Sequence, residues 1–423
     1  MPTAADDLTL IKTSLLNAIA VGVKMLTLLG LNKILAVYVG PAGYAALGQF
    51  QNAMQMISTL ASGAINTGVT KYTAEYHEDE AQQRAVWKTA GTIALVGSVL
   101  LSLLVFVFRA ELAHWFLSDV NLAPVFGWFA ATLVLFVFNT LLLAILNGKK
   151  DIQRYVVANI AGSVFSLLVT SAMVVQWGLL GALVGFAVYQ SLAFFVTLAL
   201  CVKTPWFRLS HLFGRMDKML AKNLAKYTAM ALTTAAAAPL CHILIRNHLG
   251  HNLGWEAAGY WEAMWRLSAA YLMLASTTLS VYYLPRLSEL KTSAEIRQEI
   301  IQGYRIILPV AIVSALIVYL LRHFIIETLF SLAFLPMESL FVWQLVGDVL
   351  KIAAWLFAFV MLGKSMTVTY IVTEISFSIG FYFLVTILVG RLGLVGVSIA
   401  YAINYLIYLL VVAILLNKFI KNN

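Results

Sequence analysis

Charged side chains are scarce in this sequence. Asp, Glu, Lys and Arg make up 11% of its 423 residues, whereas hydrophobic residues make up 61%. In a water-soluble globular domain about a quarter of the residues are charged. The mean hydropathy of +0.88 points in the same direction. The composition therefore excludes a soluble globular protein and predicts an integral membrane protein.

Cysteine is nearly absent as well. The two cysteines, Cys201 and Cys241, both lie in apolar surroundings. At this separation they make neither a metal-binding motif nor a disulfide framework, so we interpret them as packing residues. His248 and His251 lie close together but lack further ligands, and we expect no metal site.

The signatures of an enzyme are missing too. Gly363-Lys364-Ser365 matches the end of a phosphate-binding loop, but Ala358 stands where the first glycine of that loop would be. No nucleophile elbow or zinc-protease motif occurs, and the loops are too short for a catalytic domain. We therefore expect no enzyme and no cofactor. Energy would come from an ion gradient of H⁺ or Na⁺, from the membrane potential or from the gradient of the substrate.

Long apolar runs dominate what is present. Each is long enough to cross a bilayer as a helix, which takes about 20 residues, and barrel strands would be shorter and alternating. Gly63 and Gly68 are expected to loosen the second run. The sequence thus predicts an all-α membrane protein with about twelve spanning helices. The runs lie near residues 8–39, 44–72, 86–108, 122–146, 155–175, 179–202, 227–245, 257–283, 304–321, 339–362, 368–389 and 394–416.

The positions of Lys and Arg predict the orientation. With an even number of spans both termini lie on one side, and most of the 28 Lys and Arg residues fall on that side. Positive residues stay in the cytoplasm, so we expect a multi-pass protein of the bacterial inner membrane with both termini cytoplasmic. The net charge of +9 reflects this bias, and we expect no nucleic-acid binding.

The chain divides near its middle. Residues 204–222 form a basic, amphipathic connection in which Trp206 and Phe207 alternate with cations such as Arg208 and Arg215. Such a segment is expected to lie at the anionic cytoplasmic face. We predict an N-terminal bundle at residues 1–203, this linker, and a C-terminal bundle at residues 223–423.

The two halves also repeat. Asn147-Gly148-Lys149 matches Leu362-Gly363-Lys364, and Gly178-Leu179-Leu180-Gly181 matches Gly393-Leu394-Val395-Gly396. Two six-helix halves of the same orientation form the parallel-repeat architecture of secondary transporters, in which the site lies between the halves. We therefore expect two six-helix bundles around a central cavity.

Several charged residues fall well inside the predicted spans. An ionised group at the centre of a spanning helix costs about 2.5 to 3.5 kcal/mol, so such residues face a partner or a wet cavity. The spacing predicts local pairs between Glu262 and Arg266 and between Asp348 and Lys351. On a helix, Gln344, Asp348, Lys351 and Trp355 would share one inward face. The six charges are Lys24, Glu262, Arg266, Asp348, Lys351 and Glu374.

Four stretches carry a resemblance to a known family. They resemble the Wzx-type lipid-linked oligosaccharide flippases of the multidrug/oligosaccharidyl-lipid/polysaccharide exporter superfamily, above all those that serve enterobacterial common antigen. The stretch from Trp343 to Lys351 is the most specific. The four are Gly40-Pro41-Ala42-Gly43, Thr67-Gly68-Val69-Thr70-Lys71-Tyr72 leading into Glu75-Tyr76-His77, Val281-Tyr282-Tyr283-Leu284-Pro285-Arg286-Leu287 and Trp343-Gln344-Leu345-Val346-Gly347-Asp348-Val349-Leu350-Lys351.

The resemblance implies flipping of an undecaprenyl-diphosphate-linked oligosaccharide such as lipid III from the cytoplasmic to the periplasmic leaflet by alternating access. The polar head would need cations and hydrogen-bonding partners, while the polyprenyl tail stays in lipid. Lys24, Lys351 and Arg266 are the candidates for the diphosphate, and Asp348, Glu374 and Glu262 for ion coupling. The remaining polar candidates, which would line the cavity or join helices by hydrogen bonds, are Asn17, Gln55 and Asn66.

Two other functions stay open at this point. A drug/cation antiporter of the same superfamily would favour unpaired carboxylates, and a polytopic glycan polymerase or transferase would need a large catalytic loop. We expect a monomer that acts in the lipid bilayer, with glycan polymerase and chain-length proteins as candidate partners.

Overall fold

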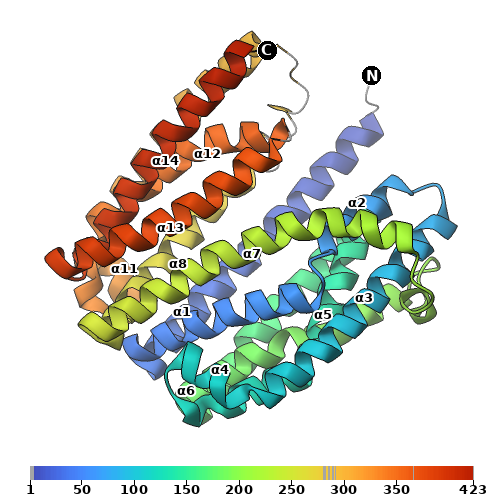
Figure 1. Ribbon diagram of the computed structural model, residues 1–423, viewed down its shortest axis with the longest axis horizontal. Coiled ribbons are helices and arrows are strands. Elements are labelled where there is room, and N and C mark those ends of the chain that lie inside the picture. The colour runs from blue at the N-terminus through green and yellow to red at the C-terminus, as the bar shows by residue number, and fades with distance from the viewer. Residues whose placement is uncertain are drawn as a thin grey trace. The chain divides into compact units, whose positions relative to one another are not determined.

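The computed structural model describes residues 4–279, 283, 286, 287, 290, 292–364 and 366–422, and in this part of the chain it contains helices and no strand (Figure 1). The stretch Val281–Leu287 therefore lies largely outside the described residues, as does the side chain of Asn17. Two compact units are present, residues 1–39 with 49–239 and residues 40–48 with 240–423. We call them the N-terminal unit and the C-terminal unit.

The N-terminal unit is built on α5, which packs against α6, α3 and α2. The division between the units falls inside α7, after the predicted linker at residues 204–222, and Gly40–Gly48 of α1 belongs to the C-terminal unit. The elements are α1 (Ala4–Ala61), α2 (Asn66–Glu75), α3 (Glu80–Val107), α4 (Arg109–Leu117), η1 (Val120–Leu122), α5 (Ala123–Gly148), α6 (Ile152–Val202), η2 (Leu209–Leu212) and the first part of α7 (Lys218–Leu253).

The C-terminal unit is built on α12, which packs against α14, α10 and α8, while α13 packs against α14. Its elements are the last part of α7, then α8 (Trp255–Thr278), α10 (Ser293–Leu320), α11 (Arg322–Leu329), η4 (Leu332–Leu340), α12 (Phe341–Gly363), α13 (Thr367–Leu392) and α14 (Val395–Asn422).

The helices match the predicted spans. Eight helical stretches of the described residues are long and apolar enough to cross a membrane. Two of them, in α1 and α6, each contain two predicted spans separated by a kink, and α7 and α8 contain the two predicted spans that are more polar. The second predicted span breaks between Ala61 and Asn66, next to Gly63, as the glycines suggested.

Local sequence explains where several helices begin. The Asp79 carboxylate accepts from the backbone N–H of Gln82 at 3.0 Å, which caps α3. At α10, Thr292 Oγ1 accepts from the N–H of Glu295, and the Glu295 carboxylate accepts from the N–H of Thr292. These contacts satisfy backbone donors that a helix start leaves without partners.

The internal repeat is visible in the order of elements. In each unit a long helix (α3, α10) precedes a short one (α4, α11), a 3₁₀ segment (η1, η4) and a second long helix (α5, α12). Arg109 donates to the carbonyl of Phe106 and stacks on its ring, and Arg322 makes the same two contacts with Tyr319. The duplication predicted from the sequence is therefore present in the fold.

The glycines matched in the sequence confirm the repeat. Gly178 kinks α6 with φ 56° and ψ −133°, and Gly393 joins α13 to α14 with φ 62° and ψ −146°. Only glycine adopts this region of backbone angles without strain. The same backbone conformation therefore joins the last two spans of both halves.

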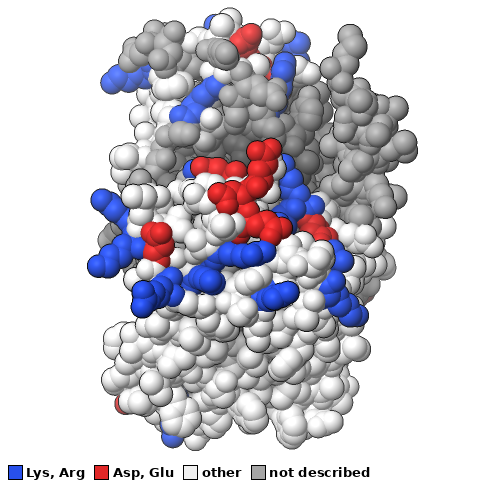
Figure 2. Space-filling model, turned by 90° about the vertical axis from the view of Figure 1, so that its right-hand side faces the viewer, with Lys and Arg blue, Asp and Glu red and all other residues white. Residues whose placement is uncertain are grey.

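Charges are unevenly distributed over the surface. On the face drawn in Figure 2, acidic and basic side chains gather in a band, and the surface below the band carries almost none. Many large apolar side chains are exposed on the long helices, for example Leu103 on α3 and Val310 on α10. A surface of this kind is suited to lipid rather than to water.

Candidate functional site

Asp348 lies on α12 and is fully buried in the C-terminal unit. Its Oδ2 accepts hydrogen bonds from Ser268 Oγ at 2.7 Å and from the Tyr271 hydroxyl, and its Oδ1 accepts from the Tyr401 hydroxyl at 2.8 Å. Donors from α8 and α14 thus converge on one carboxylate of α12. Hydrogen bonds to the charged form offset the cost of burying it.

Gln344 lies one turn before Asp348 and is also fully buried. Its Nε2 donates to Ser268 Oγ at 3.2 Å. Among the residues that the structure describes, its Oε1 has no hydrogen-bond donor. Gln344 and Asp348 therefore lie on one inward face of α12, as their spacing predicted.

Lys351 lies one turn further along, partly exposed, in a cage of four aromatic rings. Its Nζ lies 4.9 Å from the ring centroid of Trp265, 5.4 Å from Trp355, 5.7 Å from Tyr401 and 5.1 Å from Tyr405. A cation at these distances is attracted to the faces of the rings.

The sequence predicted a direct ion pair between Asp348 and Lys351, and that prediction is wrong. Among the described residues Lys351 makes no ion pair within 4 Å, although Asp348 and Glu374 attract it electrostatically from further away. Tyr401 lies between the two charges, because its hydroxyl binds Asp348 and its ring faces the ammonium of Lys351. The side chain of Tyr401 therefore takes the place of a direct contact between Asp348 and Lys351.

A second cluster of charges joins α7 and α8. Glu262 accepts from Arg246 Nη1 and from Arg266 Nε, each at 2.7 Å, and all three side chains are buried. The predicted pair of Glu262 and Arg266 is confirmed. Arg246, near the end of α7, was not among the predicted site residues; it is 1% exposed and completes the triad.

The triad carries one net positive charge inside the C-terminal unit. The Arg266 guanidinium lies 5.1 Å from the ring centroid of Tyr44, and that of Arg246 lies 5.8 Å from Trp261. Trp261 also contacts Trp265, which belongs to the cage of Lys351. An aromatic path therefore connects the two charge clusters.

We expect Gly48→Ala to destabilise the protein, because an added Cβ would lie 2.4 Å from the Glu262 carboxylate. Overpacking of this kind costs about 1–3 kcal/mol, so thermal unfolding in detergent should shift to lower temperature. Gly390→Ala is the matched control, since no described atom beyond the backbone of its own helix turn lies within 4 Å of its added Cβ. Equal unfolding temperatures for the two variants would show that the triad tolerates the methyl group.

The other predicted residues are distributed over both units. In the N-terminal unit, Lys24 and Gln55 are exposed on α1, and Asn66 at the start of α2 donates to Thr140 at 3.3 Å. Asn17 lies in α1, and its side chain is not among those described. In the C-terminal unit, Glu374 is partly exposed on α13 and is attracted to Lys351.

Asn66 belongs to a polar pocket that the sequence did not predict. The pocket has a volume of about 540 Å³ and is formed by α2, α5 and the start of α6. It offers an ammonium group from Lys71, carboxamides from Asn66 and Asn147, and a phenol from Tyr155. These groups are the hydrogen-bonding partners that hydroxyl-rich or phosphorylated ligands need.

The fold, with its long apolar helices, defines a class, the multi-pass helical membrane proteins. A solved structure titled as the inward-facing conformation of a multidrug resistance MATE family transporter of the MOP superfamily has a TM-score of 0.79 at 16% identity, covering 94% of this chain and 96% of that one. The Lipid II flippase MurJ in its inward closed conformation has a TM-score of 0.73 at 13% identity, covering 96% and 87%. The chain therefore has the fold of the MOP superfamily.

The sequence comparisons identify the family. The family model described as polysaccharide biosynthesis protein matches residues 10–291. The Lipid III flippase of Escherichia coli (strain K12) is 32% identical over 401 residues, which cover 95% of this chain and 96% of that protein. This chain belongs to the polysaccharide biosynthesis protein family, and the resemblance seen in its motifs is confirmed.

Proposed function

We propose that this protein flips an undecaprenyl-diphosphate-linked oligosaccharide, of the lipid III type, from the cytoplasmic to the periplasmic leaflet of the bacterial inner membrane. The observation that carries the proposal is the 32% identity to the E. coli Lipid III flippase over nearly the whole of both chains. Both termini would be cytoplasmic, as the Lys and Arg bias indicates. The covalent structure of the substrate would not change, so no catalytic residue is needed.

Lys351 is the residue that we propose for the diphosphate. Its ammonium lies against aromatic rings, and none of the carboxylates that the structure describes forms an ion pair with it. Cation–π contacts are weaker than a charge-assisted hydrogen bond to phosphate, and the ammonium can therefore exchange one for the other. Lys24, exposed on α1, is the second candidate.

We propose a different role for Arg266. Because Glu262 and Tyr44 already hold its guanidinium, its first function is to stabilise the buried triad together with Arg246. The net positive charge of the triad would still contribute to the potential that a diphosphate meets.

The polar pocket of the N-terminal unit suits the sugars. Its carboxamide and phenol groups from Asn66, Asn147 and Tyr155 can donate to and accept from hydroxyl groups, which a purely charged site cannot do. We propose that this pocket contacts the oligosaccharide.

Glu374 and Asp348 are the proposed coupling residues, with H⁺ or Na⁺ as the ion. Glu374→Gln is expected to make translocation insensitive to an imposed proton or sodium gradient, because the amide can neither release a proton nor attract a cation as a carboxylate does. The rate would be measured in vesicles with and without each gradient. Glu327→Gln, an exposed position on α11, is the control, and a gradient response equal to wild type in Glu374→Gln would remove Glu374 from coupling.

The proposed function is tested by expression in a bacterial strain that lacks its own lipid III flippase. The chain should restore the surface glycan, while the lipid-linked intermediate should stop accumulating. Failure to restore the glycan by a protein that reaches the membrane at normal abundance would contradict the proposal. Resistance to cationic dyes without glycan restoration would instead identify a drug/cation antiporter.

A further inference from the structure

The predicted linker folds onto the N-terminal unit. Thr92 Oγ1 donates to the carbonyl of Gly214 at 3.0 Å, and Thr89 Oγ1 accepts from the N–H of Asp217 at 3.2 Å. Leu212 is fully buried, and the Trp206 ring lies 5.6 Å from that of Trp87 on α3. The segment between α6 and α7 is therefore fixed along the first turns of α3.

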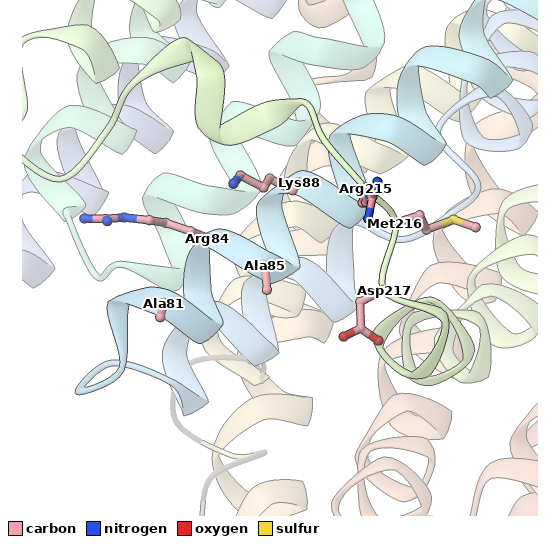
Figure 3. A pocket seen from close by; sticks show the side chains of 7 residues that line it. All are labelled: Ala81, Arg84, Ala85, Lys88, Arg215, Met216 and Asp217. Carbon is pink, nitrogen blue, oxygen red and sulfur yellow. The ribbon is translucent and has the colours of Figure 1, made fainter.

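A basic pocket lies between this segment and α3 (Figure 3). Its volume is about 490 Å³. Arg84 and Lys88 line it from α3 and Arg215 from the linker, while Ala81 and Ala85 leave room between them. Three cations thus border a space large enough for a phosphate group and its substituents.

The charges of the pocket are only partly compensated. Among the described residues, Arg84 pairs with Glu80 at 2.5 Å on the exposed surface, whereas Lys88 and Arg215 form no ion pair. The one acid in the lining, Asp217, accepts from the N–H groups of Met219 and Leu220 and so caps α7. An exposed ion pair contributes little and can be exchanged for another anion.

The neighbouring histidine experiences the same positive potential. Burial, followed by the charges of Arg84, Arg208 and Lys88, lowers the pKa of His211 below its usual range. An anion entering the pocket would meet a field that attracts it.

Apolar side chains border the cations. Phe213, Met216 and Met219 are 41%, 49% and 74% exposed, and Met216 also lines the pocket. Cations next to exposed apolar side chains are typical of segments that lie in the headgroup region of a bilayer. A soluble phosphate compound would use the cations and leave these side chains in water.

We propose that this pocket binds the phosphate of an anionic phospholipid of the cytoplasmic leaflet. Lys88 and Arg215 bind the phosphate oxygens, Arg84 adds positive charge at the edge of the pocket, and the methionines and Phe213 contact the acyl chains. None of these residues is among those proposed for the transported lipid. Binding there would make the conformation of the linker depend on the lipid composition of the membrane.

The test is the binding of phosphatidylglycerol to the full-length protein in detergent, without any lipid-linked oligosaccharide, measured by native mass spectrometry and by titration of a fluorescent analogue. The triple variant Arg84→Gln, Lys88→Gln, Arg215→Gln should bind at least about tenfold more weakly than wild type, since charge-assisted bonds to phosphate are lost. Lys203→Gln, an exposed cation directly before the linker, should bind as wild type does. Thermal unfolding confirms that each variant is folded.

Two competition experiments distinguish an anionic phospholipid from other phosphate compounds as the ligand. Phosphatidylcholine should not compete, and inorganic phosphate at millimolar concentration should not displace the lipid. Equal binding of phosphatidylglycerol by wild type and the triple variant would overturn the proposal. Displacement by inorganic phosphate at low concentration would also overturn it, because the pocket would then serve a soluble anion. Since no flipping is measured, neither result depends on the proposed function.

Discussion

Lys351→Ala is expected to slow translocation of a lipid-linked oligosaccharide by about 10- to 100-fold. This factor corresponds to the free energy of one hydrogen bond to a charged group. The variant removes the ammonium but leaves the four rings around it, so the C-terminal unit should still fold. The measurement is the initial rate in vesicles at equal protein abundance.

Two comparisons separate a role in binding from a role in packing. Lys351→Arg keeps the charge and should retain part of the rate, whereas Lys418→Ala, an exposed position near the end of α14, should retain all of it. If Lys351→Ala transports at the wild-type rate, Lys351 serves only to hold the aromatic residues of α8, α12 and α14 together.

Glu262→Gln is expected to destabilise the protein by about 3–5 kcal/mol, because it leaves two buried guanidinium groups without their shared counterion. Arg246 and Arg266 are 1% and 8% exposed, so water cannot replace the carboxylate. Thermal or denaturant unfolding of the purified protein in detergent is the measurement.

The matched control is another arginine–glutamate pair of the C-terminal unit. Arg322 and Glu338 lie 2.9 Å apart, but both side chains are about one-third exposed. Glu338→Gln should therefore cost about 0–1 kcal/mol. Equal losses of stability in Glu262→Gln and Glu338→Gln would show that the triad is solvated and does not hold α7 and α8 together.

Local sequence properties predicted most of the fold. Hydropathy placed the spans because a helix in lipid must be apolar over its whole length and must satisfy its own backbone. The match between Gly178 and Gly393 predicted the repeat, and the structure gives both the same backbone angles. The spacing of Gln344 and Asp348 predicted a common face because three to four residues complete a turn.

The partners of the charges could not be predicted in the same way, since they come from other helices. The donors to Asp348 lie 77 to 80 residues before it, on α8, and 53 residues after it, on α14. Arg246 and Glu262 are equally far from Gly254, the residue between α7 and α8. In a helical hairpin centred on Gly254, residues equally far from the turn lie at the same level, so this spacing is the sequence signal for the pair.

The most direct measurement is transfer of a labelled lipid-linked oligosaccharide between the leaflets of vesicles that contain the purified protein. The account predicts faster transfer than in protein-free vesicles, an unchanged mass of the lipid, and a rate that depends on Lys351. No acceleration by folded protein, or a covalently altered lipid, would contradict it.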